Sequence, residues 1–157
     1  MGKASERLAE LGLALPPPPP PVGRFTPAVR TGNLMFLSGL APLNAEGQPI
    51  TGKVGQDYTA EEAHGLARIV GLNLLAVMQA ELGDLDRVAR IVKVLGLVNA
   101  TPDFTRHPHV IDGCSILFSE VFPHLGAHAR TSFGAGSLPS NIPVEIEAVI
   151  EFSAESV

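Results

Sequence analysis

Apolar residues recur at helical spacing in two long segments of the chain. The first follows Thr59-Ala60-Glu61-Glu62, which has the pattern of a capping box, and it runs to Gly83, a residue suited to a helix end. The second begins near Pro108, whose missing N–H costs nothing in a first helical turn, and we expect Gly126 to close it. The pattern predicts two helices, each with an apolar face.

Short β-branched or alternating segments surround these helices and predict strands. The expected strands are Phe25–Thr31, Leu34–Ser38, Val88–Val98, Arg130–Gly134 and Val144–Phe152. Gly32-Asn33 is typical of a two-residue hairpin turn, Gly39 is expected to end the second strand, and residues 41–55 form a turn-rich loop. The order ββ, α, β, α, ββ predicts an α+β fold with two helices on one face of a sheet.

The first 21 residues differ from the rest. Residues 4–15 can form a short helix with Leu8, Leu11 and Leu15 on one stripe, and Pro16–Pro21 must be extended polyproline without backbone donors. The run is either a spacer that lays this segment across the domain or a neighbouring subunit, or a ligand for a proline-binding module; we favour the spacer. We therefore expect an N-terminal segment over 1–21 and one domain over 22–157.

Composition narrows the class of protein. Hydrophobic residues make up 45% of 157 residues and charged residues only 17%, which is apolar for a monomer and favours a buried subunit interface. The net charge of −5 and the lack of a basic run argue against nucleic acid as a partner. No signal-peptide pattern and no apolar run of about 20 residues is found, so we expect no membrane partner. A single cysteine fits a reducing cytoplasm.

The candidate chemistry lies near the C-terminus. Arg130 precedes and Glu145 follows a Gly/Ser/Pro loop, so their side chains come close if the two flanking strands are neighbours, about 4.8 Å apart. A shared functional pocket, a structural ion pair and plain surface placement all remain open, because the sequence does not fix the strand register. Cys114 lies on a helical apolar stripe and is expected in the core.

The histidines do not suggest a metal. His107 and His109 flank Pro108, while His124 and His128 stand four apart across Gly126, which breaks the shared helical face that a metal pair needs. We expect no metal site and assign these side chains to capping or solvent-facing roles.

Several spaced motifs resemble the RidA/YjgF family, also known as endoribonuclease L-PSP-like. The motifs are Gly32-Asn33-Leu34, Leu37-Ser38-Gly39, Gly83-Asp84-Leu85-Asp86, Asp103-Phe104, Ala129-Arg130-Thr131-Ser132, Leu138-Pro139 and Val144-Glu145-Ile146-Glu147-Ala148. The resemblance covers about residues 22–152, and the proline-bearing N-terminus resembles a longer subgroup of the family.

The resemblance implies a chorismate-mutase-like fold with a mixed sheet, a homotrimer with sites between subunits, and hydrolysis of 2-imino acids to 2-keto acids and ammonia without a cofactor. Arg130 matches the arginine that holds the substrate carboxylate, and Glu145 the acid that directs water. Phe25, Ser38, Gly39, Asp112 and Ser132 match positions that line the ligand pocket. We further expect that Arg130 favours ionised Glu145 in the empty site, and that a bound carboxylate offsets this effect.

Four residues depart from the family pattern. Phe25 replaces a common tyrosine, Ser132 a common cysteine, Leu40 a polar residue, and Asp112 falls near a family asparagine, where its charge could repel an anionic ligand. These departures leave two hypotheses: an imine deaminase, or a non-catalytic trimer that binds small keto acids or similar anions.

Overall fold

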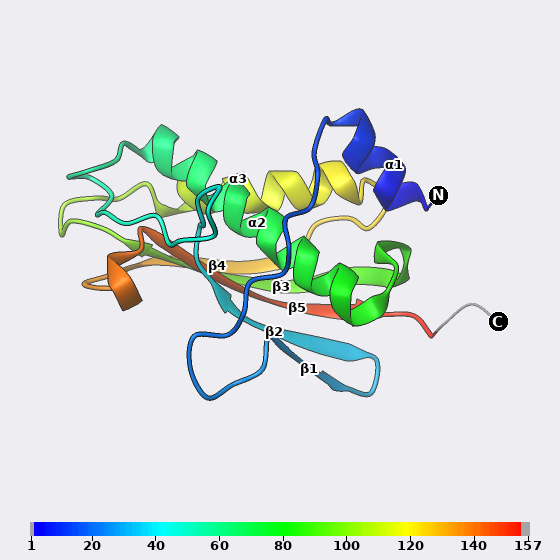
Figure 1. Cartoon of the computed structure of the whole chain (residues 1–157). Helices are drawn as coiled ribbons and strands as arrows, with labels where there is room; N and C mark the ends of the chain where they lie inside the picture. Colours follow the sequence, from blue (N-terminus) through cyan, green and yellow to red (C-terminus); the bar gives the residue numbers. More distant parts are fainter. Residues whose placement is uncertain (1, 155–157) are drawn as a thin grey trace.

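Two long helices cover one face of a five-stranded sheet in the computed structural model, which describes residues 2–154 (Figure 1). The helices are α1 (Lys3–Glu10), α2 (Ala60–Leu82) and α3 (His107–Val121), with short 3₁₀ turns η1 (Leu85–Arg87) and η2 (Pro139–Asn141). The strands are β1 (Ala28–Thr31), β2 (Leu34–Leu40), β3 (Val88–Asn99), β4 (Ala129–Ala135) and β5 (Val144–Phe152). The predicted α+β class, with its helices on one face, is confirmed; Met1 and residues 155–157 of the predicted segments lie outside the described residues.

Strand β3 lies between β4 and β5 in the sheet. This order corrects the assumption that β4 and β5 are neighbours. The strand order is β1-β2-β5-β3-β4, in which β3 pairs with β4 in parallel and with β5 antiparallel. A parallel pair needs a crossover connection, and α3 provides it between β3 and β4. Strand β5 then returns along the other side of β3, so β3 separates Arg130 from Glu145.

Local signals fixed the helix and hairpin ends where side chains or glycines act directly. Thr59 and Glu62 form the predicted reciprocal capping box, and Gly83 ends α2 in the left-handed conformation. Thr31 pairs with Leu34 across the Gly32-Asn33 turn, with Gly32 at φ 58°. Helix α2 is long and apolar enough to cross a membrane, with a mean hydropathy of 1.3, but 56% of that window is buried in the fold.

Other ends differ from the prediction. Helix α1 stops at Glu10 rather than near residue 15, because Gly12 turns the chain with φ 69°. Helix α3 stops at Val121 rather than near Gly126, because Phe122 precedes Pro123 and a residue before proline is driven out of the helical region. Strand β1 begins only at Ala28, and β2 continues through Gly39 to Leu40 with a register shift after Leu37.

The core lies between the helices and the sheet, and it depends on a close crossing of α2 and α3. Gly113 stands so near α2 that a Cβ atom there would lie 2.0 Å from the backbone oxygen of His64. Cys114, beside it, is fully buried, as predicted, and burial raises the pKa of its thiol, which disfavours the reactive thiolate.

The N-terminal segment is attached to this core. The Asp86 carboxylate accepts hydrogen bonds of 2.8 Å from the backbone N–H groups of both Lys3 and Ala4, which places a negative charge at the start of α1. Ala4 and Leu8 are buried in the same hydrophobic cluster as the domain. From α1 the chain passes α2 and reaches the β1–β2 hairpin, so the proline run lies along the domain (Figure 1).

The sheet face opposite the helices, called here the open face, carries both apolar and acidic side chains. Val29, Phe36 and Phe133 are 55%, 47% and 44% exposed: Phe36 stands between buried neighbours on β2, Val29 pairs with it, and Phe133 pairs with Leu97. Glu145 and Glu147 lie on the same face, because Val144, Ile146 and Ala148 point into the core. No helix of residues 2–154 covers this face (Figure 1).

Two glycine-to-alanine substitutions in the helices should change the free energy of unfolding in opposite directions, and the first of them tests the close crossing. Gly113→Ala forces a methyl group against the backbone of α2, so we expect a loss of about 2–3 kcal/mol in the free energy of unfolding. Gly65→Ala on α2 meets no atom within 4 Å, and we expect a gain of about 0.5–1 kcal/mol from helix propensity. Urea unfolding at one fixed protein concentration measures both; a neutral Gly113→Ala contradicts the close crossing.

Candidate functional site

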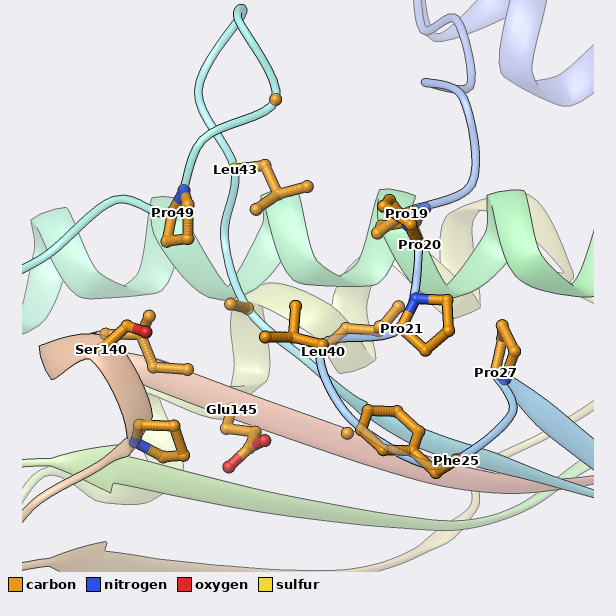
Figure 2. A pocket seen from close by; sticks show the side chains of 16 residues that line it. Pro19, Pro20, Pro21, Phe25, Pro27, Leu40, Leu43, Pro49, Ser140 and Glu145 are labelled. Atoms are coloured by element: carbon orange, nitrogen blue, oxygen red, sulfur yellow. The ribbon is translucent and has the colours of Figure 1, made fainter.

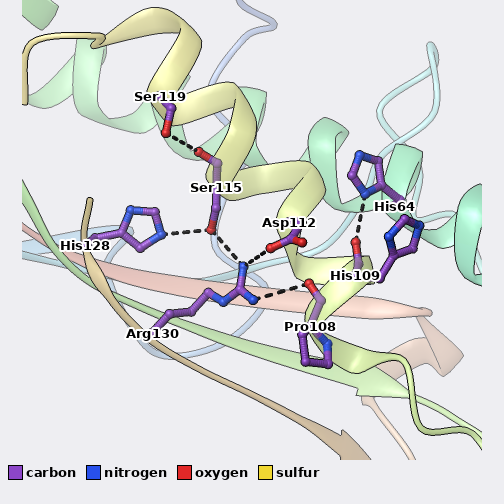
Figure 3. Close-up of polar contacts among 8 residues, drawn as sticks. All are labelled: His64, Pro108, His109, Asp112, Ser115, Ser119, His128 and Arg130. Atoms are coloured by element: carbon purple, nitrogen blue, oxygen red, sulfur yellow. Dashed lines mark hydrogen bonds and ion pairs between the residues drawn. The ribbon is translucent and has the colours of Figure 1, made fainter. Parts of the chain in front are cut away.

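Arg130 is held by helix α3 from three directions (Figure 3). Its Nη1 donates to Asp112 Oδ1 at 2.6 Å and to Ser115 Oγ at 3.1 Å, and its Nη2 donates to the Pro108 carbonyl at 3.3 Å. The side chains of Arg130 and Asp112 are 20% and 45% exposed, so the pair sits at the rim of the fold. The guanidinium is thus fixed in orientation before any ligand arrives.

One edge of the Arg130 guanidinium stays available. The three bonds use both N–H groups of Nη1 and one of Nη2, and within residues 2–154 the Nε–H and the second Nη2–H have no partner. An Nε–H and an Nη2–H of a guanidinium can together donate in parallel to the two oxygens of a carboxylate. Arg130 also borders a cleft of about 550 Å³ lined by Ser115, Ile116, Ser119, His128, Arg7 and Glu120.

Ser115 and His128 join the site although the sequence did not single them out as functional. Ser115 Oγ lies 2.8 Å from His128 Nε2. Ser115 Oγ accepts from Arg130, and its own O–H can donate to His128 when Nε2 is unprotonated; Figure 3 shows both contacts. Burial, followed by the Arg130 charge, lowers the pKa of His128 and favours this neutral form. The only sequence signal for His128 was its position two residues before Arg130, since side chains two apart in an extended chain point to the same side.

Glu145 lies on the opposite face of the sheet from Arg130. Arg130 pairs with Val94, whose side chain is buried under the helices, whereas Glu145 pairs with Leu97 on the open face. The two candidate residues are therefore not brought together within one protomer, and the expected influence of Arg130 on Glu145 is wrong for the single chain. Burial first, and then the charge of Glu147, raises the pKa of Glu145.

Two cavities meet at the Glu145 carboxyl. The first, called here the acidic cleft, has a volume of about 320 Å³ and is lined by Phe25, Ser38, Gly39, Leu97, Glu145 and Glu147. The second, called here the proline pocket, has a volume of about 270 Å³ and lies between the proline run, Leu40 and the loop at Ser140 (Figure 2). Gly39 keeps the junction open, since a Cβ there would stand 3.0 Å from Glu145 Oε1.

The remaining predicted site residues divide between the two faces. Phe25, Ser38 and Gly39 surround Glu145, and the Phe25 side chain is 49% exposed at the junction of the two cavities. Asp112 contacts Arg130 directly, as an ion pair. Ser132 stands two residues after Arg130 on β4, opposite Gly96, and lines none of these three cavities. Among residues 2–154, no group of three His, Cys, Asp or Glu side chains could hold a metal ion.

The proline run contributes to the site, which its sequence did not reveal. Pro19, Pro20 and Pro21 form one wall of the proline pocket, and Phe25 and Pro27 continue that wall (Figure 2). Across from them stand Leu43 and Pro49 of the loop predicted over residues 41–55. Glu145 is the only ionisable residue among the residues that line this pocket.

Comparison with known proteins identifies the family to which the chain is similar. A family model described as "YjgF/chorismate_mutase-like, putative endoribonuclease" matches residues 5–151. Protein TCP17 of Trypanosoma cruzi is 37% identical over 97% of this chain and 96% of its own length. A 2-iminobutanoate/2-iminopropanoate deaminase of Dermatophagoides farinae is 29% identical over 83% of this chain and 87% of its own.

The fold agrees with these sequence matches. A crystal structure from Shewanella oneidensis, also described as an endoribonuclease, superposes with a TM-score of 0.92 at 28% identity and covers 96% of this chain and 100% of that one. The match to the family model includes the strands that carry Arg130 and Glu145 and the helices that cover the sheet. The chain belongs to the YjgF/RidA family and has its chorismate-mutase-like fold.

Proposed function

We propose that this protein hydrolyses 2-imino acids to 2-keto acids and ammonia, with Arg130 holding the carboxylate and Glu145 activating water. The observation that carries the proposal is the environment of Glu145: a half-buried carboxyl with a raised pKa, at an open junction of two cavities. Within residues 2–154 it has no hydrogen-bond partner, so it is free to bind a water molecule or a protonated nitrogen.

The reaction needs little beyond positioning and one proton acceptor. Water adds to the carbon of the C=N bond, which a protonated nitrogen already makes electrophilic, and one water proton passes to the Glu145 carboxylate. Glu145 then returns the proton to the amine nitrogen. As the C–N bond breaks, the new hydroxyl group gives its proton to Glu145, and the released ammonia takes that proton, so that ammonium and the keto acid leave. The raised pKa of Glu145 lies nearer to neutral pH, and at such a pH the carboxyl can both accept a proton and return it.

The proposed site requires a second copy of the chain. Arg130 stands at β4, the edge strand of the sheet, while Glu145 stands on the open face two strands away. A ligand on the acidic cleft of one protomer can therefore use Arg130 only from another protomer. The apolar residues of the open face, Val29, Phe36 and Phe133, supply a surface for that contact, and we propose the homotrimer of the family as the assembly.

A binding module without turnover remains the second candidate, on one observation. Phe25 borders both cavities next to Glu145 and provides no hydroxyl that could orient a water or a nitrogen. A trimer of this kind would bind a keto acid or a similar anion through Arg130. RNA cleavage, which the family description names, is disfavoured because the cleft carries the carboxylates of Glu145 and Glu147 and the chain has a net charge of −5.

Imine hydrolysis tests the two candidates against each other. Imines released by an amino-acid oxidase should lose ammonia faster in the presence of this protein. Arg130→Ala should lower kcat/KM about 100-fold, because two charge-assisted hydrogen bonds are lost. Arg106→Ala, which removes an exposed cation paired with Glu61, is the matched control and should leave the rate unchanged. Binding of 2-ketobutyrate without any acceleration would support the binding module.

Subunit mixing tests the shared site. Arg130→Ala and Glu145→Gln should each be inactive alone, yet trimers reassembled from an equal mixture should recover about a quarter of the wild-type activity, because one in four interfaces then pairs an intact Arg130 with an intact Glu145. Activity that stays at the level of the separate variants contradicts a site built from two copies.

Ligand binding should take up protons. Burial and Glu147 already raise the pKa of Glu145, and a bound anion that excludes water raises it further, so the protonated fraction increases on binding. The affinity for 2-ketobutyrate should therefore fall as the pH rises through this pKa. Calorimetry in two buffers of different ionisation enthalpy measures the uptake. Glu145→Gln should abolish it, and proton release by the wild type would count against the assignment.

Asp112 should weaken the binding of a ligand carboxylate to Arg130, because the negative charge of Asp112, at 2.6 Å from the guanidinium, offsets the positive charge of Arg130. Asp112→Asn keeps an oxygen acceptor for Arg130 and removes the charge. We expect a two- to fivefold lower Kd for 2-ketobutyrate, about the effect of a half-exposed ion pair. Asp103→Asn, in the exposed turn before α3, is the charge-matched control. An unchanged or higher Kd for Asp112→Asn shows that the ion pair positions Arg130 rather than competing with the ligand.

A further inference from the structure

The proline pocket adds an apolar compartment to the acidic cleft. Its wall is built from proline rings, Leu40, Leu43 and Ile142, and its polar side chains are Glu145 and Ser140 alone (Figure 2). Proline has no backbone N–H, so residues 19–21 offer no donor to a ligand or to water. The pocket therefore favours hydrocarbon over polar groups.

The volume of the pocket exceeds what a small imine can fill. About 270 Å³ holds roughly nine water molecules at about 30 Å³ each. A bound water needs two to four polar partners, and most of this wall supplies none. Displacing such poorly held water by an apolar group gains affinity, whereas a methyl or ethyl substituent leaves most of the pocket hydrated.

The two cavities share the residues at which the reaction is proposed to occur. Phe25, Gly39 and Glu145 line both the acidic cleft and the proline pocket. A substrate whose reacting carbon lies at Glu145 in the cleft therefore projects its remaining substituent toward the proline pocket. The gap at Gly39, where a Cβ would meet Glu145, leaves the passage open.

We propose that the proline pocket receives the side chain of the substrate, so that the protein selects 2-imino acids with bulky apolar side chains over those derived from alanine or 2-aminobutyrate. This inference rests on the proposed function and assigns a role to the N-terminal segment: it forms a wall that determines specificity. The attachment of α1 to Asp86 and the burial of Leu8 hold that wall in place.

Two sets of ligands test the selectivity in the full-length protein. Imine hydrolysis is compared for imines of leucine, phenylalanine, 2-aminobutyrate and alanine, and calorimetry compares 4-methyl-2-oxopentanoate with pyruvate. We expect kcat/KM and affinity at least about tenfold higher for the apolar members, since each buried methylene contributes several-fold. Calorimetry reads the pocket even without turnover, which separates failure of this inference from failure of the proposed reaction.

Filling the pocket gives the decisive comparison. Ala41 lines the pocket, and Ala41→Leu should lower the leucine-derived kcat/KM and the 4-methyl-2-oxopentanoate affinity about tenfold while leaving the alanine-derived substrate and pyruvate unchanged. Ala80→Leu, at an exposed position of α2, is the matched control. Leu43→Ser, which makes the wall polar without adding volume, should lower the same preference if Ala41→Leu does not fold.

Three outcomes overturn the inference. One is equal affinity for 4-methyl-2-oxopentanoate and pyruvate in the wild type. Another is an equal loss for all ligands in Ala41→Leu, which would place a different occupant in the pocket, such as a segment of a second copy. The third is an apolar preference that survives in both Ala41→Leu and Leu43→Ser. Retained imine hydrolysis in any of these cases leaves the proposed function intact.

Discussion

The pairing of β3 with β4 on one side and β5 on the other is the constraint from which the functional geometry follows. Because α3 carries the chain from β3 to its parallel neighbour β4, it must lie against the helix face, and there it grips Arg130 through Asp112 and Ser115. Because β5 runs antiparallel on the far side of β3, its alternation sends Glu145 to the open face. A single chain thus presents a cation and a carboxyl that cannot meet.

The separation of Arg130 from Glu145 is consistent with a role of the apolar open face in association between copies of the chain. The uncovered sheet exposes Phe36 and Phe133, and association would bury this apolar surface as well as complete the proposed site. In the proposed trimer, stability and chemistry therefore depend on the same contact. The environment of each half is already set within the protomer: Arg130 has one edge free, and Glu145 lies where burial raises its pKa.

Sequence reasoning succeeded where short-range interactions decide the structure. The Thr59 box, the Gly83 stop and the Gly32-Asn33 turn all act within a few residues and were found where predicted. It failed at the neighbours of β4, because strand order depends on contacts far apart in the chain. The grouping of Phe25, Gly39 and Glu145 came from family resemblance, whereas the Ser115–His128 bond and the wall formed by Pro19–Pro21 needed coordinates, since no spacing rule joins such distant segments.

The length of the proline run also determines which proline rings reach the pocket, because the run connects α1 to the sheet. A polyproline helix advances about 3.1 Å and turns about a third of a revolution with each residue. Adding or removing one proline between Leu15 and Val22 would therefore displace the rings that face Leu40 and rotate a different edge toward the cavity, without altering the chemistry of the wall. The number of prolines therefore sets the shape of the compartment together with the side chains that face the wall, such as Leu40 and Leu43, and under the proposed function a change in this number changes the substituents that the pocket can receive.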